Sequence, residues 1–549
     1  MPSLVLGPLL RHAGEDEATV WVETDAPCTV EVLGHAARTF HVAGHHYALV
    51  VIRGLEPGRA VPYEVTLDGE RVWPLPDGEW PPSLIRTTTR DRPIDVVFGS
   101  CRVAYPHEPP FTLTKDDDAK GREVDALRAL ALRMREGDPE DWPGALVMLG
   151  DQIYADEVEP ETRRFIAGRR DPTVPPYVEL CGFEEYTCAY RVSWTDPPIR
   201  WLLSTVPSAM IFDDHDVIDD WNTSHDWIEA IRAQGWWDER IVSAFTSYWI
   251  YQHIGNLAPE SLATDDIYNA VLEASDGEPI LREFAWRADR TVNSTQWSFC
   301  RDLGSARLIM VDSRAGRILD PERRTMVDDD EWAFIFEHAT GHHHDHVLIG
   351  TSLPWLMAPG MHHLEAWNEA LCEGAWGRWV ARGSEALRRA LDLEHWAAFN
   401  DSWTSMRDMI GEIGSHDANG QAPATIVALS GDVHHAYLAE VSYPGSAGVR
   451  SKVYQAVCSP FRNPLDTRER RVMKAMASKP AAAVTRRLAR AAGVPETGIH
   501  WQLRQDAVFD NVVATLSLRG REAELRIERA RPSDDGHSVR LEPAFQGRL

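Results

Sequence analysis

Two stretches, DVVFGSC at residues 95–101 and ALVMLGDQIYAD at residues 145–156, decide the fold. Each is a short apolar run that leads into a glycine, after which polar residues with metal-binding side chains follow. Between them, VDALRALALRMREG at residues 124–137 has the spacing of an amphipathic helix that ends at a glycine cap. This alternation of buried strands and a helix is typical of a layered α/β protein. In such proteins, sites form beyond the carboxyl ends of the strands.

The same pattern recurs along the chain. Five more apolar runs behave in this way: SAMIFDDHD (208–216), ARLIMVDSR (306–314), HVLIGTS (346–352), TIVALSGDVH (425–434) and KVYQAVCSP (452–460). Most of them end in polar, ligand-capable residues. One such ending would mean little, whereas several in one chain indicate that their loops gather around a common site.

Residues 1–90 follow a different rule, because they alternate between polar and apolar in short runs broken by turns. This pattern predicts a small all-β sandwich of immunoglobulin or fibronectin type. We expect an α/β domain over residues 91–464, with an insertion at about 220–295 that is rich in Trp and acidic residues. Residues 465–549 are expected to form helices and a β-hairpin that complete this domain.

The composition and charge of the chain exclude several classes of function. The chain has 549 residues and a formal net charge of −28. An acidic surface repels nucleic-acid backbones and anionic membranes, and no nucleic-acid-binding surface is evident. An anionic substrate would therefore need metal ions as a local source of positive charge. The seven scattered cysteines indicate neither a disulfide framework nor a structural zinc site.

The sequence shows no targeting segment. No window approaches 18 uninterrupted apolar residues, so no membrane span is expected. The N-terminus carries neither a charged region before its apolar stretch nor a twin arginine, which favours a cytoplasmic protein. The oligomeric state is not indicated.

The loop after the run ALVML carries the first candidate ligands. Asp151 follows a glycine directly, and its two carboxylate oxygens can bridge two cations. Tyr154 can return its phenol oxygen to the same cluster, where phenolate suits Fe(III). A turn aspartate beside a packing tyrosine is the alternative.

Two further loops add carboxylates and histidines. In the DDHD segment at residues 213–216, neighbouring acids would repel one another unless a multivalent cation neutralised them. His215 can protonate a leaving alkoxide, because the pKa of histidine lies near neutral pH. In an extended backbone, Asp432 and His434 project to the same side and can reach one dinuclear centre. An exposed acidic loop is the alternative for the DDHD segment.

A thiol and two arginines complete the candidates. The thiolate of Cys101 can bind a metal, and the guanidinium of Arg102 can grip phosphate through two hydrogen bonds. Arg314 is a second candidate for phosphate binding. An inert core cysteine and a structural ion pair are the respective alternatives for Cys101 and Arg314.

Some histidines are set aside. The tract Gly341–His346 resembles a metal-binding segment, but it precedes the strand VLIG and so lies at the wrong end for the site. His362 and His363 follow that strand, and we expect them to be structural.

In this order, the motifs resemble those of the alkaline phosphatase D (PhoD-like) family of calcineurin-like metallophosphoesterases. The matching segments are FGSC (98–101), LGDQIYAD (149–156), FDDHDVIDDW (212–221), VDSR (311–314) and LSGDVH (429–434). The resemblance implies a four-layer α/β/β/α core, in which two sheets face each other and helices lie outside. It also implies an N-terminal β-sandwich like the one expected here.

The resemblance further implies a cluster of Fe³⁺ and Ca²⁺, with Zn²⁺, Mn²⁺ or Mg²⁺ as alternatives at the second site. Its catalytic residues would be Asp151 and His215, acting on a water polarised by the metals. The iron ligands would be Cys101, Asp151, Tyr154 and His434. Asp151 would bridge to a second cation held by Asp214 and Asp432. Apart from the resemblance, we expect Arg102, Arg314 and His435 to bind the substrate.

The sequence also departs from the family. The twin-arginine signal typical of its exported members is absent. Asp216 replaces a usual glutamate, and Asp219 and Asp220 replace a usual pair of asparagines, which can change the metal at the second site.

We therefore expect a metal-dependent hydrolase of phosphate monoesters or diesters. The alternatives are a binding protein with a vestigial metal site and a metal hydrolase that acts on non-phosphate esters.

Overall fold

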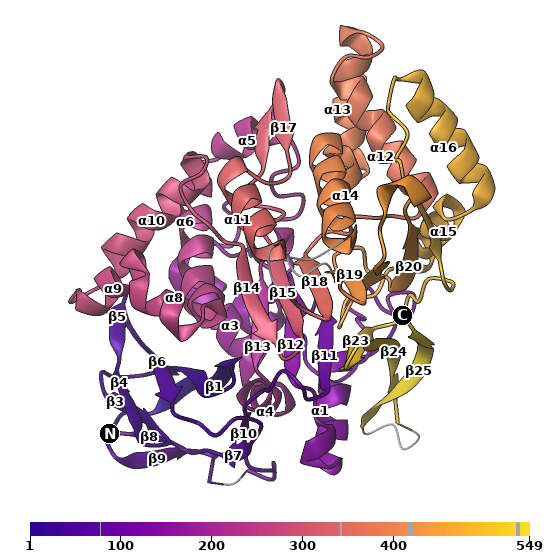
Figure 1. The fold of residues 1–549 in the computed structure, drawn as a ribbon. Helices are drawn as coiled ribbons and strands as arrows, with labels where there is room; N and C mark the ends of the chain where they lie inside the picture. The colour runs from indigo at the N-terminus through magenta and orange to yellow at the C-terminus, as the bar shows by residue number, and fades with distance from the viewer. Residues whose placement is uncertain (77, 341–342, 416–420, 534–537) are drawn as a thin grey trace.

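The N-terminal part of the chain is all-β. The computed structural model describes residues 1–76, 78–340, 343–415, 421–533 and 538–549. It begins with two four-stranded sheets, in the orders β1-β2-β6-β5 and β4-β3-β8-β9 (Figure 1). Val20, Val50 and Val65 come from both sheets and are fully buried in one core. The strands are β1 (Leu4–Ala13), β2 (Glu17–Thr24), β3 (Thr29–Val32), β4 (His35–Arg38), β5 (Phe40–Val42), β6 (His45–Arg53), β8 (Val65–Leu67) and β9 (Glu70–Trp73), with a small pair of β7 (Ala60–Pro62) and β10 (Leu84–Arg86).

A six-stranded sheet follows, in the order β13-β12-β11-β23-β24-β25. Its strands are β11 (Ile94–Gly99), β12 (Ala145–Leu149), β13 (Ser208–Ile211), β23 (Val512–Arg519), β24 (Glu522–Pro532) and β25 (Val539–Arg548). The first three strands are parallel, so their carboxyl ends lie at one edge. β23 pairs antiparallel with β11, which makes the C-terminal hairpin part of this sheet.

A seven-stranded sheet has the order β14-β15-β18-β19-β21-β20-β22 and faces the six-stranded sheet. Its strands are β14 (Phe299–Leu303), β15 (Ala306–Val311), β18 (His346–Thr351), β19 (Thr425–Ser430), β20 (Tyr437–Ser442), β21 (Lys452–Val457) and β22 (His500–Leu503). β15, β18, β19 and β21 run parallel. Leu149 of β12 reaches Gly350 of β18, where a Cβ would lie only 3.3 Å from its Cδ2. The two sheets therefore pack face to face.

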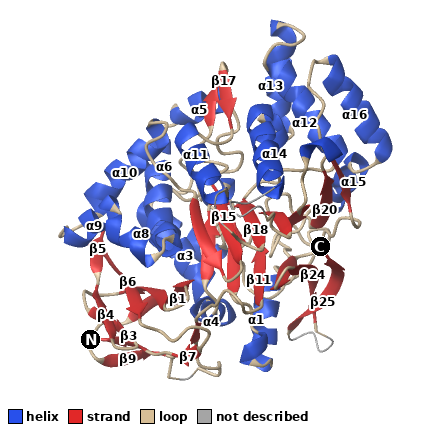
Figure 2. Ribbon diagram, in the orientation of Figure 1, coloured by secondary structure: helices blue, strands red, loops and turns tan. Residues whose placement is uncertain are grey.

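Helices cover the outer faces of both sheets (Figure 2). α1 (Ala126–Glu136) packs on the six-stranded sheet. α11 (Asp329–Ala339) and α14 (Asn400–Ser415) cover the seven-stranded one, where Ile335 and Ile410 join Ile349 of β18 in a shared core. This arrangement confirms the predicted α/β fold class with its four layers and its all-β N-terminal part.

The remaining elements lie around this core. α2 (Pro160–Arg169), α3 (Phe183–Thr195) and α4 (Pro197–Thr205) lie between β12 and β13 in the chain. The segment predicted as an insertion contains α5 (His225–Arg232), α6 (Trp237–Tyr248), α7 (Ile254–Asn256), α8 (Pro259–Thr264), α9 (Asp266–Glu273) and α10 (Glu278–Arg290). A small hairpin consists of β16 (Ile318–Asp320) and β17 (Arg323–Thr325). None of the described helices is both long and apolar enough to cross a membrane.

Four helices project from one end of the molecule, and we call them the helical arm (Figure 1). They are α12 (Pro359–Cys372), α13 (Arg378–Ala390), α15 (Thr467–Met476) and α16 (Lys479–Ala491). α12 packs against both α13 and α16. The indole of Trp376, between α12 and α13, donates to the carbonyl oxygen of Ala491 at 3.3 Å.

The histidines set aside from the sequence have structural surroundings. His346 begins β18, and its ring nitrogens contact Thr425 Oγ1 and the Gly520 carbonyl oxygen, both at 2.7 Å. Gly341 and His342 lie outside the described residues. His362 is buried in α12 beside the rings of Trp403 and Trp501.

Candidate metal centre

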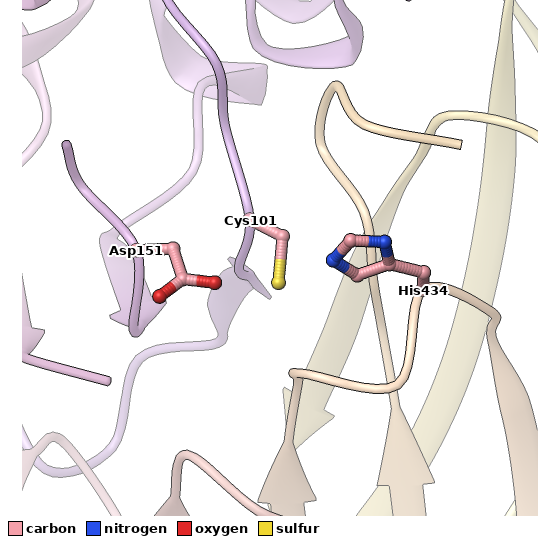
Figure 3. Close-up of side chains that lie close together, drawn as sticks. All are labelled: Cys101, Asp151 and His434. Atoms are coloured by element: carbon pink, nitrogen blue, oxygen red, sulfur yellow. The ribbon is translucent and has the colours of Figure 1, made fainter. Parts of the chain in front are cut away.

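Three loops from distant parts of the sequence meet between the two sheets. Cys101 follows β11, Asp151 follows β12, and His434 follows β19. The Cys101 sulfur, a carboxylate oxygen of Asp151 and a ring nitrogen of His434 all lie within 4.8 Å of one another. Figure 3 shows these side chains pointing toward one another. Asp151 also belongs to a second group of this kind, with Asp213 and Asp214, so it lies where a bridging carboxylate would lie.

The backbone at these positions is unusual. The φ angles of Cys101, Asp151, Asp432 and His434 are 58°, 55°, 64° and 51°, in the left-handed region that residues other than glycine rarely adopt. Each such residue costs on the order of 1–3 kcal/mol, and residues of this kind cluster at functional sites. The loops therefore hold these side chains in a fixed arrangement against a local conformational preference.

Two glycines let the loops approach one another closely. A Cβ at Gly150 would lie 2.5 Å from Asp213 Cβ, and a Cβ at Gly431 would lie 2.0 Å from Ser100 Oγ. Both distances are far below van der Waals contact. The Gly-Asp pairs in LGD and SGD thus serve to bring the loops together as well as to form turns.

The residues fit a bound cation. Burial, together with the nearby carboxylates of Asp151 and Asp432, raises the pKa of Cys101 well above its usual range. Burial and Cys101 likewise raise the pKa of Tyr154. The buried Oδ1 of Asp151 has no hydrogen-bond partner among the described residues. A multivalent cation would satisfy this oxygen and stabilise the thiolate and phenolate, which are otherwise disfavoured here.

Tyr154 and His434 are oriented for the same cluster. The Tyr154 hydroxyl donates to Asp151 Oδ2 at 3.3 Å. Burial, with a contribution from Lys115, lowers the pKa of His434 to about 3. The imidazole is therefore neutral and keeps a lone pair for a metal.

His215 lies beside the cluster and is held from two sides. Its Nδ1 lies 2.9 Å and 3.0 Å from the two carboxylate oxygens of Asp156. Its ring stacks on Tyr154 with a centroid separation of 4.5 Å. Asp156, His215 and Asp219 form a third group of potential ligands.

Arg314 lies in a buried network of ion pairs. Its guanidinium is fully buried and pairs with Asp213 Oδ1 at 2.5 Å and Glu394 Oε1 at 2.6 Å. It also lies 3.2 Å from Asp214 Oδ1 and 3.5 Å from Asp432 Oδ1. The structural ion pair, considered as an alternative from the sequence, describes this contact, and burial leaves no surface for phosphate.

Arg314→Met is expected to lower the free energy of unfolding by about 3–5 kcal/mol. The reason is that removing one member of a buried ion-pair network leaves an uncompensated charge, here that of Asp213, while Glu394 keeps its contact with Arg317. Urea denaturation followed by Trp fluorescence measures the change.

Arg282→Met is the matched control for that experiment. Arg282 pairs with Glu239 at the surface, where the side chains are 38% and 45% exposed, so its loss should cost less than about 1 kcal/mol. Equal losses for the two variants would contradict the assigned role of Arg314.

Arg102 and His435, which are also predicted to bind substrate, contact other groups of the protein. Arg102 is buried and donates to Asp125 Oδ2 at 2.7 Å and to the Ser193 carbonyl oxygen at 3.0 Å. His435 is 5% exposed, and its Nδ1 lies 2.6 Å from the Val433 carbonyl oxygen. Its ring stacks against the rings of two neighbours, Tyr437 and Phe509. Both side chains thus make internal contacts, and their roles in substrate binding stay predictions.

The three aspartates that depart from the family pattern, Asp216, Asp219 and Asp220, have different surroundings. Asp216 accepts hydrogen bonds from the backbone N–H groups of Asp151, Gln152 and Asp213, so it fixes the ligand loops to one another. The Asp219 side chain is 66% exposed, at the rim. Burial and the charge of Glu394 raise the pKa of Asp220 to about 9.

Three residues at the site were missed from the sequence. Glu394 pairs with Arg314, while His395 contacts Asp432 Oδ2 at 3.2 Å and Glu365 Oε1 at 2.7 Å. They belong to α12 and to the segment after α13. Glu365 lies inside α12, well beyond the end of β18, and the other two residues follow a helix, so none of the three directly follows a strand and the strand-end rule gave no signal for them.

Two facing β-sheets with potential metal ligands at the strand ends are the fold of the calcineurin-like metallophosphoesterases. Residues 133–286 match the family described as PhoD-like phosphatase, and residues 1–85 match a domain of unknown function, DUF7800. The resemblance stated from the motifs is thereby confirmed. The first match contains Asp151, Tyr154, Asp214 and His215, whereas Cys101 and His434 lie outside it and are brought to the site by the fold.

A solved structure shares this fold. One described as "Structure of PhoD" has 12% sequence identity and a TM-score of 0.60, and the alignment covers 99% of this chain and 89% of the other. A purple acid phosphatase from yellow lupin (Lupinus luteus) seeds has 11% identity and a TM-score of 0.47, over 97% and 73% of the two chains. The comparison with curated proteins gives no match.

Proposed function

We propose that this protein hydrolyses phosphate esters at a centre of two or three metal ions. The observation that carries the proposal is the position of Asp151, which belongs both to the group with Cys101 and His434 and to the group with Asp213 and Asp214. The match to the PhoD-like phosphatase family supports a metal-dependent phosphoesterase.

The donor atoms of the side chains suggest which residues would hold each of two different cations. Cys101, Asp151, Tyr154 and His434 would hold Fe³⁺, since phenolate and thiolate favour a highly charged transition metal. Asp214 and Asp432, with Asp151, offer only oxygen, which suits Ca²⁺. Zn²⁺, Mn²⁺ and Mg²⁺ are the alternatives at this second position. Bound cations would polarise the attacking water and offset the charge of the phosphoryl oxygens.

His215 supplies the proton for the leaving group. Its Nδ1 is held by Asp156, and this fixes the direction of Nε2. The Nε2–H would donate its proton to the departing alkoxide oxygen, as a general acid does. Burial disfavours the charged ring, but the carboxylates of Asp156 and Asp214 outweigh it and raise the pKa of His215 well above its usual range. The ring therefore carries the required proton.

A hydrolysis assay with one generic phosphodiester and one generic monoester, with Fe and Ca²⁺ present, tests the proposal. We expect turnover that orthophosphate and vanadate inhibit competitively. Turnover of carboxylic esters without inhibition by either anion would favour a hydrolase of non-phosphate esters. Absence of any turnover in a protein that holds its metals would favour the binding-protein alternative.

His215→Ala is expected to lower kcat by a factor of about 10²–10⁴ while KM changes much less, because a general acid acts mainly in the transition state. Steady-state kinetics with a substrate that has a poor leaving group measure the effect. His225→Ala is the control, since this histidine is 48% exposed on α5 and its Nε2 lies 3.5 Å from Glu229 Oε1 on the same helix. A rise in KM at unchanged kcat would refute the acid role.

A further inference from the structure

The carboxylate of Asp432 is held on several sides. Its Oδ2 lies 3.2 Å from His395 Nε2, and its Oδ1 lies 3.5 Å from a guanidinium nitrogen of Arg314. Its backbone N–H donates to Ser100 Oγ at 3.0 Å. Each oxygen therefore faces a different donor, and the rotation of the carboxylate is restricted.

His395 is itself held by a second carboxylate. Its Nδ1 lies 2.7 Å from Glu365 Oε1, and the His395 side chain is 8% exposed. Glu365 is fully buried, and its other oxygen, Oε2, has no hydrogen-bond partner among the described residues. The chain Glu365–His395–Asp432 thus runs from a buried anion to the edge of the candidate metal centre.

This contact originates in the helical arm. Glu365 lies on α12, and His395 follows α13 in the chain. The adjacent residue, Glu394, pairs with Arg314 and with Arg317. The base of the arm therefore reaches Asp432 directly through His395 and indirectly through Glu394 and Arg314.

We propose that Glu365 and His395 form a positioning pair for Asp432 and thereby set the affinity of the second cation site. The inference rests on the proposed function, in which Asp432 holds that cation. A hydrogen bond to one oxygen of a ligating carboxylate fixes the direction of the other, and loss of such support typically weakens metal binding by about 10–100-fold. Glu365 in turn fixes the ring of His395, so that Nε2 faces Asp432.

Calcium affinity of the iron-loaded protein tests this role. Isothermal titration calorimetry with Ca²⁺ should give a Kd about 10–100 times higher for His395→Ala than for the natural protein. Iron per chain and the visible absorption of the iron site should not change. His395→Gln should recover most of the affinity, because its amide N–H can replace Nε2–H. Glu365→Gln should show a smaller loss than His395→Ala.

Two further variants make the outcome decisive. His362→Gln changes a buried histidine of the same helix, α12, that packs on aromatic rings, and should leave the Ca²⁺ affinity unchanged. Asp432→Asn should weaken Ca²⁺ binding; if it does not, the ligand set in the proposed function fails. The positioning role is overturned if Asp432→Asn weakens Ca²⁺ binding and His395→Ala does not. A lowered unfolding temperature of His395→Ala would then show that His395 is only structural.

Discussion

Replacing Asp151 by Asn should lower kcat/KM by a factor on the order of 10³ or more. Asp151 belongs to two of the three groups of potential ligands, and its buried Oδ1 has no hydrogen-bond partner among the described residues. An amide can neither carry the charge nor bridge two cations through two anionic oxygens. Losing several kcal/mol of charge stabilisation in the transition state corresponds to a rate loss of about this size.

Steady-state hydrolysis of a phosphodiester, with metal content measured on the same samples, checks the expected loss at Asp151. Asp302→Asn is the matched control, because Asp302 pairs with Arg307 at the surface and is 55% exposed. A variant of Asp151 that keeps both its metals and a rate within tenfold of the natural protein would contradict the bridging role.

Cys101→Ala is expected to weaken binding of the first metal by a factor on the order of 10² or more, since it removes a direct ligand. Activity and the visible charge-transfer absorption should fall with the metal. The fold should persist, because Cys101 packs in a small cluster with Val103, Tyr105 and Tyr154 rather than in the main core. Plasma mass spectrometry and the visible spectrum measure the outcome.

Cys458→Ala is the control for this experiment. Cys458 is also fully buried and directly follows a neighbouring strand, β21, yet it belongs to none of the groups of potential ligands among the described residues. Iron content that is unchanged in Cys101→Ala, or equally reduced in Cys458→Ala, would refute a specific thiolate ligand.

Sequence reasoning predicted correctly that several potential metal ligands lie at strand ends. The run ALVML predicts β12. Asp151 must lie at the end of this strand, because only Gly150 separates the two in the sequence. The same local logic applies to Cys101 after β11 and to His434 after β19. Short apolar runs also indicate the parallel strands, since burial on both faces requires continuous apolar residues.

Sequence reasoning could not predict contacts between residues that lie far apart in the chain. Arg102 and Arg314 have the chemistry of phosphate ligands, but Asp125 and Asp213 bury and neutralise them from positions far along the chain. His395 reaches Asp432 because a helical arm returns to the site, and no local pattern shows where such an arm ends. Hydrogen bonds across the fold decided these roles, and they follow no sequence period.

The pairing of β11 with β23 has a consequence for biosynthesis. Phe98 lies opposite Ala514, so this edge of the strand that leads to Cys101 stays open while more than 400 residues are translated. An open strand edge is a template for aggregation, and pairing across so large a separation is slow because of loop-closure entropy. Until residues 512–519 have been translated, this edge of β11 therefore lacks its partner strand. The six-stranded sheet is thus completed only by the last part of the chain to be made, the strands β23, β24 and β25.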